Sequence, residues 1–248
     1  MNFFSDIFSY AFLTNALAAA VFTGISCGII GSYVVCRRTV FLSGGITHAS
    51  FGGIGLAYMA GFEPMIGAAV FAVLSALGIE YAGDRGRMRQ DSAIGIMWSV
   101  GMALGIIFIY LTPGYTPDLG SILFGSILTV SRTEIVVSAV LTVAVTAVFA
   151  LFGRAVMYVA FDTQFARSQG VPVRMVNYSM AVLTALTIVL SIRSVGIVLL
   201  ISLLTFPAVI ADGMTRSFRT MIPLAALCGV AASVLGLVLS YNMNVPAS

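Results

Sequence analysis

Long, unbroken apolar runs limit what this chain can fold into more than any other feature. Of its 248 residues, 60% are hydrophobic and only 8% are charged, whereas soluble domains carry about 25% charged residues. A helix needs about 20 apolar residues to cross a bilayer, and it satisfies its backbone polar groups within one segment. The sequence therefore predicts an all-α transmembrane helical bundle. It excludes a soluble globular enzyme, a disordered chain and a nucleic-acid-binding protein.

The apolar runs predict about eight spans, separated by segments that carry Gly, Pro and charged residues. Their approximate ranges are 10–36, 42–61, 64–82, 92–111, 133–152, 175–192, 194–212 and 220–241. The stretch 117–131 is apolar but short, and we expect a re-entrant or interfacial piece there. Together the spans predict one transmembrane domain over residues 1–248.

The basic residues, all of them arginine, predict the orientation of the spans. Ten of the 12 arginines follow odd-numbered spans, and only Arg132 and Arg193 fall on the other side. Because cytoplasmic loops carry the excess of positive charge, we expect these loops in the cytoplasm and the N-terminus outside. The outer face is then negative. This charge either favours cation entry or only reflects the exclusion of arginine from that side.

Small residues recur at every fourth position in the first two spans. Such residues let helix backbones approach closely in lipid, so we expect tight helix packing along them. The positions concerned are Gly24, Gly28, Gly45, Ala49 and Gly53.

His48, the only histidine of the chain, falls inside the second span. An ionisable side chain within a span is a functional-site hypothesis by default, and imidazole is a common ligand of transition metals. Gly44 and Gly52 lie one turn away on the same helix face, so we expect a face without side chains beside the ring. Polar Ser43 and Thr47 lie nearby. Two interpretations stay open, a metal contact and a structural histidine bonded to a neighbouring helix.

The segment 153–174 is predicted to be a cytoplasmic loop that contains a short helix. Asp162 can cap its N-terminus, and Gly170 suits a left-handed C-terminal end. Phe165 and Ala166 give it an apolar face. A defined helix of this kind either docks to a partner protein or lies on the membrane surface.

Several segments, in this order, resemble the membrane permeases of metal-ion ABC importers of the zinc, manganese and iron class. The first is SGGITHASFGGIGLAYMAG, and the second is DSAIGIMWSVGMALGIIFIY followed by PDLGSILFGSILTVS. The third is FDTQFARSQGVPV, and SVGIVLLISLLTFPAVIADGMTRS comes last. The resemblance covers about residues 20–246. It implies ATP-driven import of a divalent metal ion by alternating access across a bacterial inner or cell membrane.

The resemblance also implies the partners of the chain. They are a second copy of the permease, two cytosolic ABC ATPase subunits and an extracellular or periplasmic metal-binding protein. The segment that couples to the ATPase would comprise Asp162, Thr163, Gln164, Phe165, Ala166, Arg167 and Gly170. The chain has no lysine and no Gly-x-x-x-x-Gly-Lys-Ser/Thr motif, so we expect the partner subunit to bind and hydrolyse ATP. We expect no permanently bound cofactor and no enzymatic activity in this chain.

The chain departs from the pattern of these permeases at two positions. Gly44 stands where they carry an Asp four residues before the histidine, and Ser121 stands where they carry a second His. His48 and Asp118, with Thr47 and Ser43, therefore form the predicted metal pathway, which would contact the ion transiently and use both copies of the dimer. Which metal passes stays open.

Two further expectations concern the C-terminus and a rival function. The end LSYNMNVPAS resembles a turn after which related permeases often continue, so a ninth span is expected beyond Ser248 if the chain is a fragment.

The alternative function is an ion-coupled secondary transporter or a cation channel. Few carboxylates within the spans and no clear inverted repeat argue against it.

Overall fold

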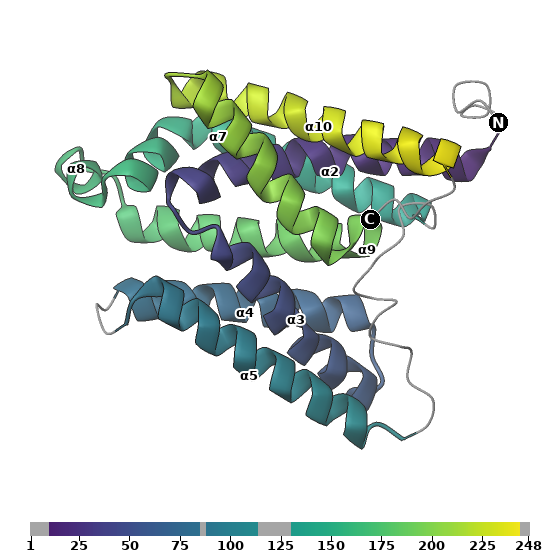
Figure 1. The fold of residues 1–248 in the computed structure, drawn as a ribbon. Coiled ribbons are helices and arrows are strands. Elements are labelled where there is room, and N and C mark those ends of the chain that lie inside the picture. Colours follow the sequence, from purple (N-terminus) through teal and green to yellow (C-terminus); the bar gives the residue numbers. More distant parts are fainter. Residues whose placement is uncertain (1–9, 85–87, 114–129, 244–248) are drawn as a thin grey trace. The chain divides into compact units, whose positions relative to one another are not determined.

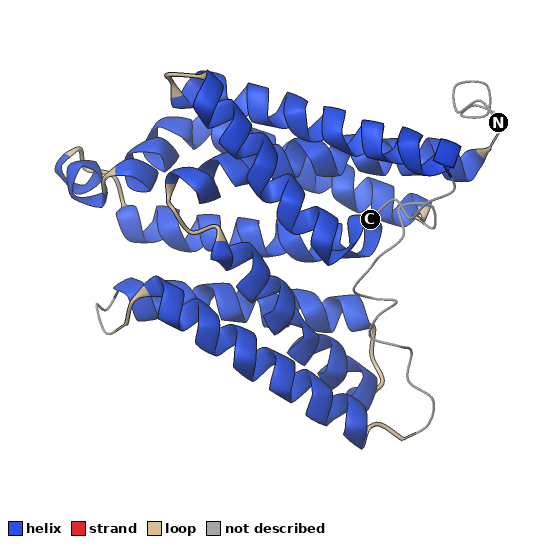
Figure 2. Cartoon of the chain, in the orientation of Figure 1, coloured by secondary structure: helices blue, strands red, loops and turns tan. Residues whose placement is uncertain are grey.

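The computed structural model describes residues 10–84, 88–113 and 130–243, and every regular element in these ranges is a helix (Figure 2). The helices are α2 (Ala11–Cys36), α3 (Phe41–Ala60), α4 (Pro64–Asp84), α5 (Gln90–Leu111), α7 (Arg132–Phe161), α8 (Thr163–Ser168), α9 (Val173–Met214) and α10 (Phe218–Met243). The predicted all-α fold is confirmed. Most of the predicted stretch 117–131, including Asp118 and Ser121, lies outside the described residues.

Six of the described helices are long and apolar enough to cross a membrane, namely α2, α4, α5, α7, α9 and α10. The 42 residues of α9 span about 63 Å at 1.5 Å per residue, roughly twice the thickness of a bilayer core. Gly196, with φ 73° and ψ 169°, interrupts this helix, and glycine adopts such angles without a steric penalty. The two halves of α9 thus match the predicted spans 175–192 and 194–212.

One predicted boundary is wrong. Helix α7 continues to Phe161, well past the predicted end at 152. Gly153 follows the predicted end, but a glycine inside a helix costs only about 1 kcal/mol. The helix therefore continues past it into the segment that is predicted to be a loop.

The chain forms two compact units. One contains residues Met1–Val35, Leu119–Gly153 and Leu190–Ser248, and the other contains Cys36–Asp118 and Arg154–Val189. Helices α7 and α9 each contribute residues to both units. A single permease domain over residues 1–248 stays a prediction.

In the second unit, α3, α4 and α5 lie side by side and contact one another (Figure 1). Their backbones approach so closely that a Cβ atom on Gly53 of α3 would overlap the carbonyl of Gly67 on α4. A Cβ atom on Gly101 of α5 would likewise overlap the backbone of Ala49, with the Ala49 oxygen 2.7 Å away. Close contacts of this kind are how helices gain packing energy in lipid.

In the first unit, close backbone contacts at glycines also join α2 to α10. A Cβ atom on Gly24 would lie 2.8 Å from the backbone of Gly229, and one on Gly28 would lie 2.5 Å from the carbonyl oxygen of Ala225. Helix α2 also contacts α7 through a 2.8 Å hydrogen bond between the hydroxyls of Ser26 and Thr142. Small residues and buried hydroxyls therefore both hold this unit together.

Three ion pairs among the described residues bear on the topology. They join Arg37 to Glu80, Arg174 to Asp84 and Arg193 to Glu134. Each pair connects two residues that the arginine distribution predicts on the same side of the membrane. These contacts support the alternation of the loops, whereas the direction of the N-terminus rests on the arginine excess alone.

Candidate functional site

Helix α3 carries the histidine, although its own sequence favours a helix only weakly. Five of its 20 residues are glycine, and each glycine in a helix interior costs about 1 kcal/mol relative to alanine. Packing against α4 and α5 offsets this cost, because most of α3 is buried. The helix ends at Gly61, whose φ of 75° is left-handed and whose N–H donates to the carbonyl of Ala57 at 2.8 Å.

The imidazole of His48 lies flat against the indole of Trp98 on α5. The two ring centroids are 4.3 Å apart, and the ring planes differ by 10°. The ring of Phe51 is also near, with its centroid 6.1 Å from that of the imidazole. His48 is half-buried, and its Nδ1 atom is buried without a hydrogen-bond partner among the described residues. Packing rather than hydrogen bonding therefore orients this ring.

The glycines near His48 could admit either an ion or another helix, and the contacts of Gly52 favour the second. A Cβ atom there would lie 2.8 Å from the ring of Phe71 on α4 and 3.1 Å from the carbonyl oxygen of Gly101 on α5. The glycine therefore makes room for neighbouring helices rather than for an ion. Trp98 also covers one side of the histidine ring.

The hydroxyl groups near His48 differ in their hydrogen-bond partners. Ser43 donates to the carbonyl of Val40 at 2.8 Å, and Ser50 donates to the carbonyl of Thr47 at 2.6 Å. The Thr47 hydroxyl is buried without a partner among the described residues. Adjacent residues diverge by about 100° around a helix, so Thr47 and Ser43 lie on a neighbouring face of α3, away from that of His48.

The described residues contain no group of three or more His, Cys, Asp or Glu side chains that could hold a metal ion. Asp118 lies outside these residues, so the structure does not test its place beside His48. Within the described part of one chain, the site is a single imidazole. Such a site suits a brief contact with an ion better than tight coordination, which for transition metals usually needs several ligands.

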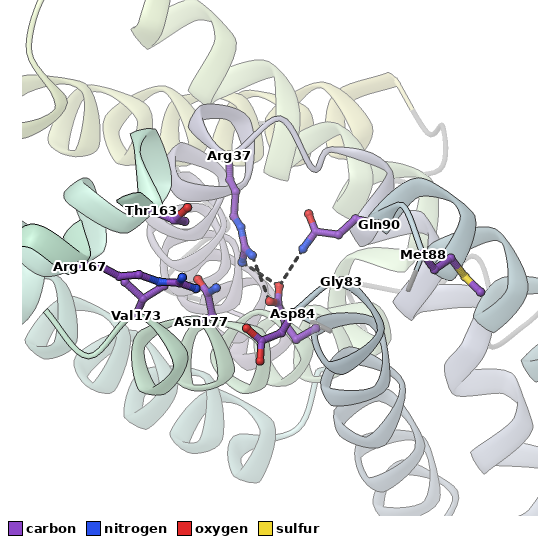
Figure 3. Close-up of a pocket in the computed structure, with 10 residues that line it drawn as sticks. Arg37, Gly83, Asp84, Met88, Gln90, Thr163, Arg167, Val173 and Asn177 are labelled. Atoms are coloured by element: carbon purple, nitrogen blue, oxygen red, sulfur yellow. Dashed lines mark hydrogen bonds and ion pairs between the residues drawn. The ribbon is translucent and has the colours of Figure 1, made fainter. Parts of the chain in front are cut away.

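A second polar feature lies at the end of α4, next to α8 and the start of α9. It is a cavity of about 320 Å³ (Figure 3). The residues that line it are Arg37, Glu80, Gly83, Asp84, Met88, Gln90, Thr163, Arg167, Val173 and Asn177. All of them belong to one compact unit. Side chains that come from α8 therefore share one cavity with those of α4 and α9.

Glu80 is the centre of the bonds around this cavity. Its carboxylate accepts hydrogen bonds from both terminal nitrogens of Arg37, at 2.7 and 3.0 Å, and from the side-chain amide of Gln90 at 3.3 Å. The Glu80 side chain is only 5% exposed. Asp84 pairs with Arg174 at 3.0 Å, but the Arg174 side chain is 75% exposed. The two pairs therefore differ in energy, because water screens an exposed pair and leaves it worth about 0–1 kcal/mol.

Helix α8 has the ends that its sequence predicts. Asp162 accepts the backbone N–H groups of Gln164 and Phe165 at 2.8 and 3.0 Å. Gly170, with φ 73°, follows the helix in the left-handed region. These local bonds hold the short helix in one place relative to the end of α7.

The expected apolar face of α8 needs correction. Ala166 is fully buried and packs with Val159 and Val173. Phe165 is 46% exposed and meets Tyr158 edge-on, with ring centroids 5.3 Å apart. Ala166 therefore belongs to the small core beneath the helix, and Phe165 is the apolar side chain left at its surface.

Sequence reasoning missed Trp98 and the bonds of Glu80. Both residues have a feature in the sequence that could have pointed to them. Trp98 is the only tryptophan and falls inside a predicted span, and Glu80 is a carboxylate inside another span, which needs a partner. The sequence could not identify the partners, because both contacts join different helices.

The long apolar helices of the described residues define a multi-pass membrane protein. The chain belongs to the ABC 3 transport family, which matches residues 9–248. It is therefore a transmembrane permease of the ABC type.

Named relatives and a solved structure agree with this family. The chain is 37% identical to the manganese transport system membrane protein MntC of Halalkalibacterium halodurans, over 98% of this chain and 83% of that protein. It is 34% identical to the chelated iron transport system membrane protein YfeD of Yersinia pestis, over 97% of this chain and 80% of that protein. Its fold is similar to a chain in the structure of PsaBC from Streptococcus pneumoniae in complex with a Fab. The TM-score is 0.85 at 35% identity, covering 99% of this chain and 88% of that one.

Proposed function

We propose that this chain is the permease subunit of an ATP-driven importer that carries a divalent transition-metal ion, namely manganese, iron or zinc. The manganese and chelated-iron systems named for its relatives support this cargo. The observation that carries the proposal is the half-buried imidazole of His48 inside the helix bundle, with its Nδ1 atom unbonded among the described residues. Neutral imidazole is a ligand that these metals share.

His48 is the first contact that we assign to the pathway, with Asp118 as a further polar group along it. Thr47 and Ser43 would add hydroxyl groups from the neighbouring face of α3. A route with few ligands suits transport, because an ion must be held well enough to enter and weakly enough to leave. Each chain supplies one histidine, so a second copy of the permease would double the ligands. Dimerisation thus belongs to the proposal.

The energy would come from two cytosolic ATPase subunits that bind the segment from Asp162 to Gly170. Helix α8 is rigidly capped and exposes Phe165, and these features suit a docking element. Its residues Thr163 and Arg167 also line the cavity that contains the bonds of Glu80. A displacement of α8 would therefore shift the side chains at the end of α4, because side chains of both helices line the same cavity.

The remaining parts of the proposal concern location and delivery. The family favours a bacterial inner-membrane protein, and the arginine distribution favours an N-terminus outside and α8 in the cytoplasm. The ion would then reach the outer face from an extracellular or periplasmic metal-binding protein. The ion-coupled rival differs in one measurable respect, because its transport would continue without ATP.

The test is ion uptake by proteoliposomes that contain this chain together with its ATPase subunits. Uptake of Mn²⁺, Fe²⁺ or Zn²⁺ should require ATP. His48→Ala should lower it by roughly tenfold, which corresponds to the loss of one ion contact of about 1.4 kcal/mol. Ser50→Ala is the matched control, because its hydroxyl bonds only within α3. Normal uptake by His48→Ala would remove this residue from the pathway, and uptake without ATP would favour the rival function.

A further inference from the structure

Trp98 is the only tryptophan of the chain, and its indole stacks on the only histidine. The ring centroids are 4.3 Å apart and the planes are within 10° of parallel. The two side chains come from different helices, α5 and α3, and both residues belong to the same compact unit. Parallel stacking over this distance restricts how the smaller imidazole ring can turn.

Backbone contacts next to the stack hold the two rings together. Gly101, three residues after Trp98, lies against the backbone of Ala49, the residue after His48. A Cβ atom on Gly105, one turn further along α5, would lie 2.7 Å from the carbonyl oxygen of Phe51. The position of α5 along α3 is therefore determined by main-chain contacts, which vary less than side-chain contacts do.

Histidines that bind metal ions usually obtain their orientation from a hydrogen bond. The second ring nitrogen donates to a carboxylate, a backbone carbonyl or a water molecule, and this bond determines the ring plane. For His48, the described residues provide no such bond, since Nδ1 is buried and unbonded. Some other contact must orient the ring, and the indole is the large flat surface that lies against it.

We propose that Trp98 is a positioning residue for the passing metal ion. By stacking on His48, it holds the plane of the imidazole and so directs a ring nitrogen into the pathway. The electron-rich face of the indole also favours positive charge on the stacked ring, as develops when the imidazole binds a cation. This inference rests on the proposed role of His48.

The first experiment uses Trp98 as its own reporter. Because the chain has one tryptophan, the tryptophan emission of the purified full-length chain in lipid vesicles comes from the indole beside His48. Mn²⁺, which is paramagnetic, should quench this emission in a saturable manner, and Mg²⁺ at the same concentration should not. His48→Gln should abolish the saturable quenching. Equal quenching in wild type and His48→Gln, or none in wild type at concentrations that saturate uptake, would overturn the proposal.

The second experiment measures uptake kinetics in the complete transporter. Trp98→Ala should raise the KM for Mn²⁺ by about tenfold, the lower end of the effect of removing a residue that orients a ligand. The maximal rate of ATP hydrolysis and the recovery of the ATPase subunits should not change. Trp98→Phe, which keeps an aromatic face, should restore most of the affinity. Tyr110→Ala is the matched control, because Tyr110 lies on the same helix and is 88% exposed.

A double variant separates positioning from general packing. If Trp98 acts through His48, the variant with both His48→Ala and Trp98→Ala should be no worse than His48→Ala alone. Effects that multiply would contradict the proposal. If His48→Ala impairs uptake but Trp98→Ala does not, only the role of Trp98 fails. If His48→Ala transports normally, the proposed pathway itself fails.

Discussion

Removal of the Glu80 carboxylate should destabilise this protein far more than removal of any exposed charge. The Glu80 side chain is 5% exposed and that of Arg37 is 13% exposed, and two short bonds join them. Glu80→Leu would leave the mostly buried guanidinium of Arg37 without this carboxylate. Breaking a buried pair in this way costs about 3–5 kcal/mol. We expect a loss of this size in the free energy of unfolding.

Two comparison variants make this prediction specific. Asp84→Asn removes the pair with the exposed Arg174 and should cost at most about 1 kcal/mol. Changing Arg37→Met together with Glu80→Leu removes both buried charges, so it should cost less than Glu80→Leu alone. The order of stability should therefore be Asp84→Asn first, the double variant next and Glu80→Leu last.

The assay is denaturation of the purified full-length chain by SDS in mixed micelles, followed by circular dichroism. Equal losses for Glu80→Leu and Asp84→Asn would refute the reasoning, because burial would then have no influence on the strength of the pair. A double variant less stable than Glu80→Leu would refute it as well. That order would mean that Arg37 stabilises the fold through its other contacts rather than through Glu80.

Two other predictions concern the loop helix and the helix contacts. Phe165→Asp should prevent copurification of the ATPase subunits with the tagged chain, whereas Ser168→Asp on the same helix should not; retention of the subunits by Phe165→Asp would contradict docking through α8. Gly24→Ala should destabilise the chain by about 1–3 kcal/mol, because the added carbon would lie 2.8 Å from the backbone of Gly229. Gly236→Ala should be neutral or stabilising, since open space surrounds Gly236. Thermal unfolding should therefore show a lower Tm for Gly24→Ala and an unchanged or higher Tm for Gly236→Ala.

Local sequence rules predicted a helix well where its length and its ends depend only on residues within or next to that helix. The apolar runs located the spans to within a few residues for α2, α3, α4 and α5. The ends of α8 followed from Asp162 and Gly170, whose effects act over three or four residues. The predicted span end at 152 falls short of the helix end, because α7 continues to Phe161.

Predictions that depended on neighbouring helices were less successful. The glycines around His48 left room for either an ion or another helix, and Phe71 of α4 occupies the space beside Gly52. Phe165 and Ala166 were expected to form one apolar surface, yet Ala166 is buried and Phe165 is exposed. A small residue indicates that another part of the chain can pack closely against the helix at that position. The sequence does not identify the residue that packs there.

The sequence by itself determined that the chain has many long apolar helices, where most of them begin and end, and that one histidine lies inside a largely apolar helix. These properties follow from apolar length, capping and charge placement, all of which act within a segment or beside it. Only the tertiary structure decided that Trp98 stacks on His48 and that Arg37 pairs with Glu80, 43 residues away. Both contacts join separate helices. Such pairings depend on how the helix backbones pack, and no single segment encodes that packing.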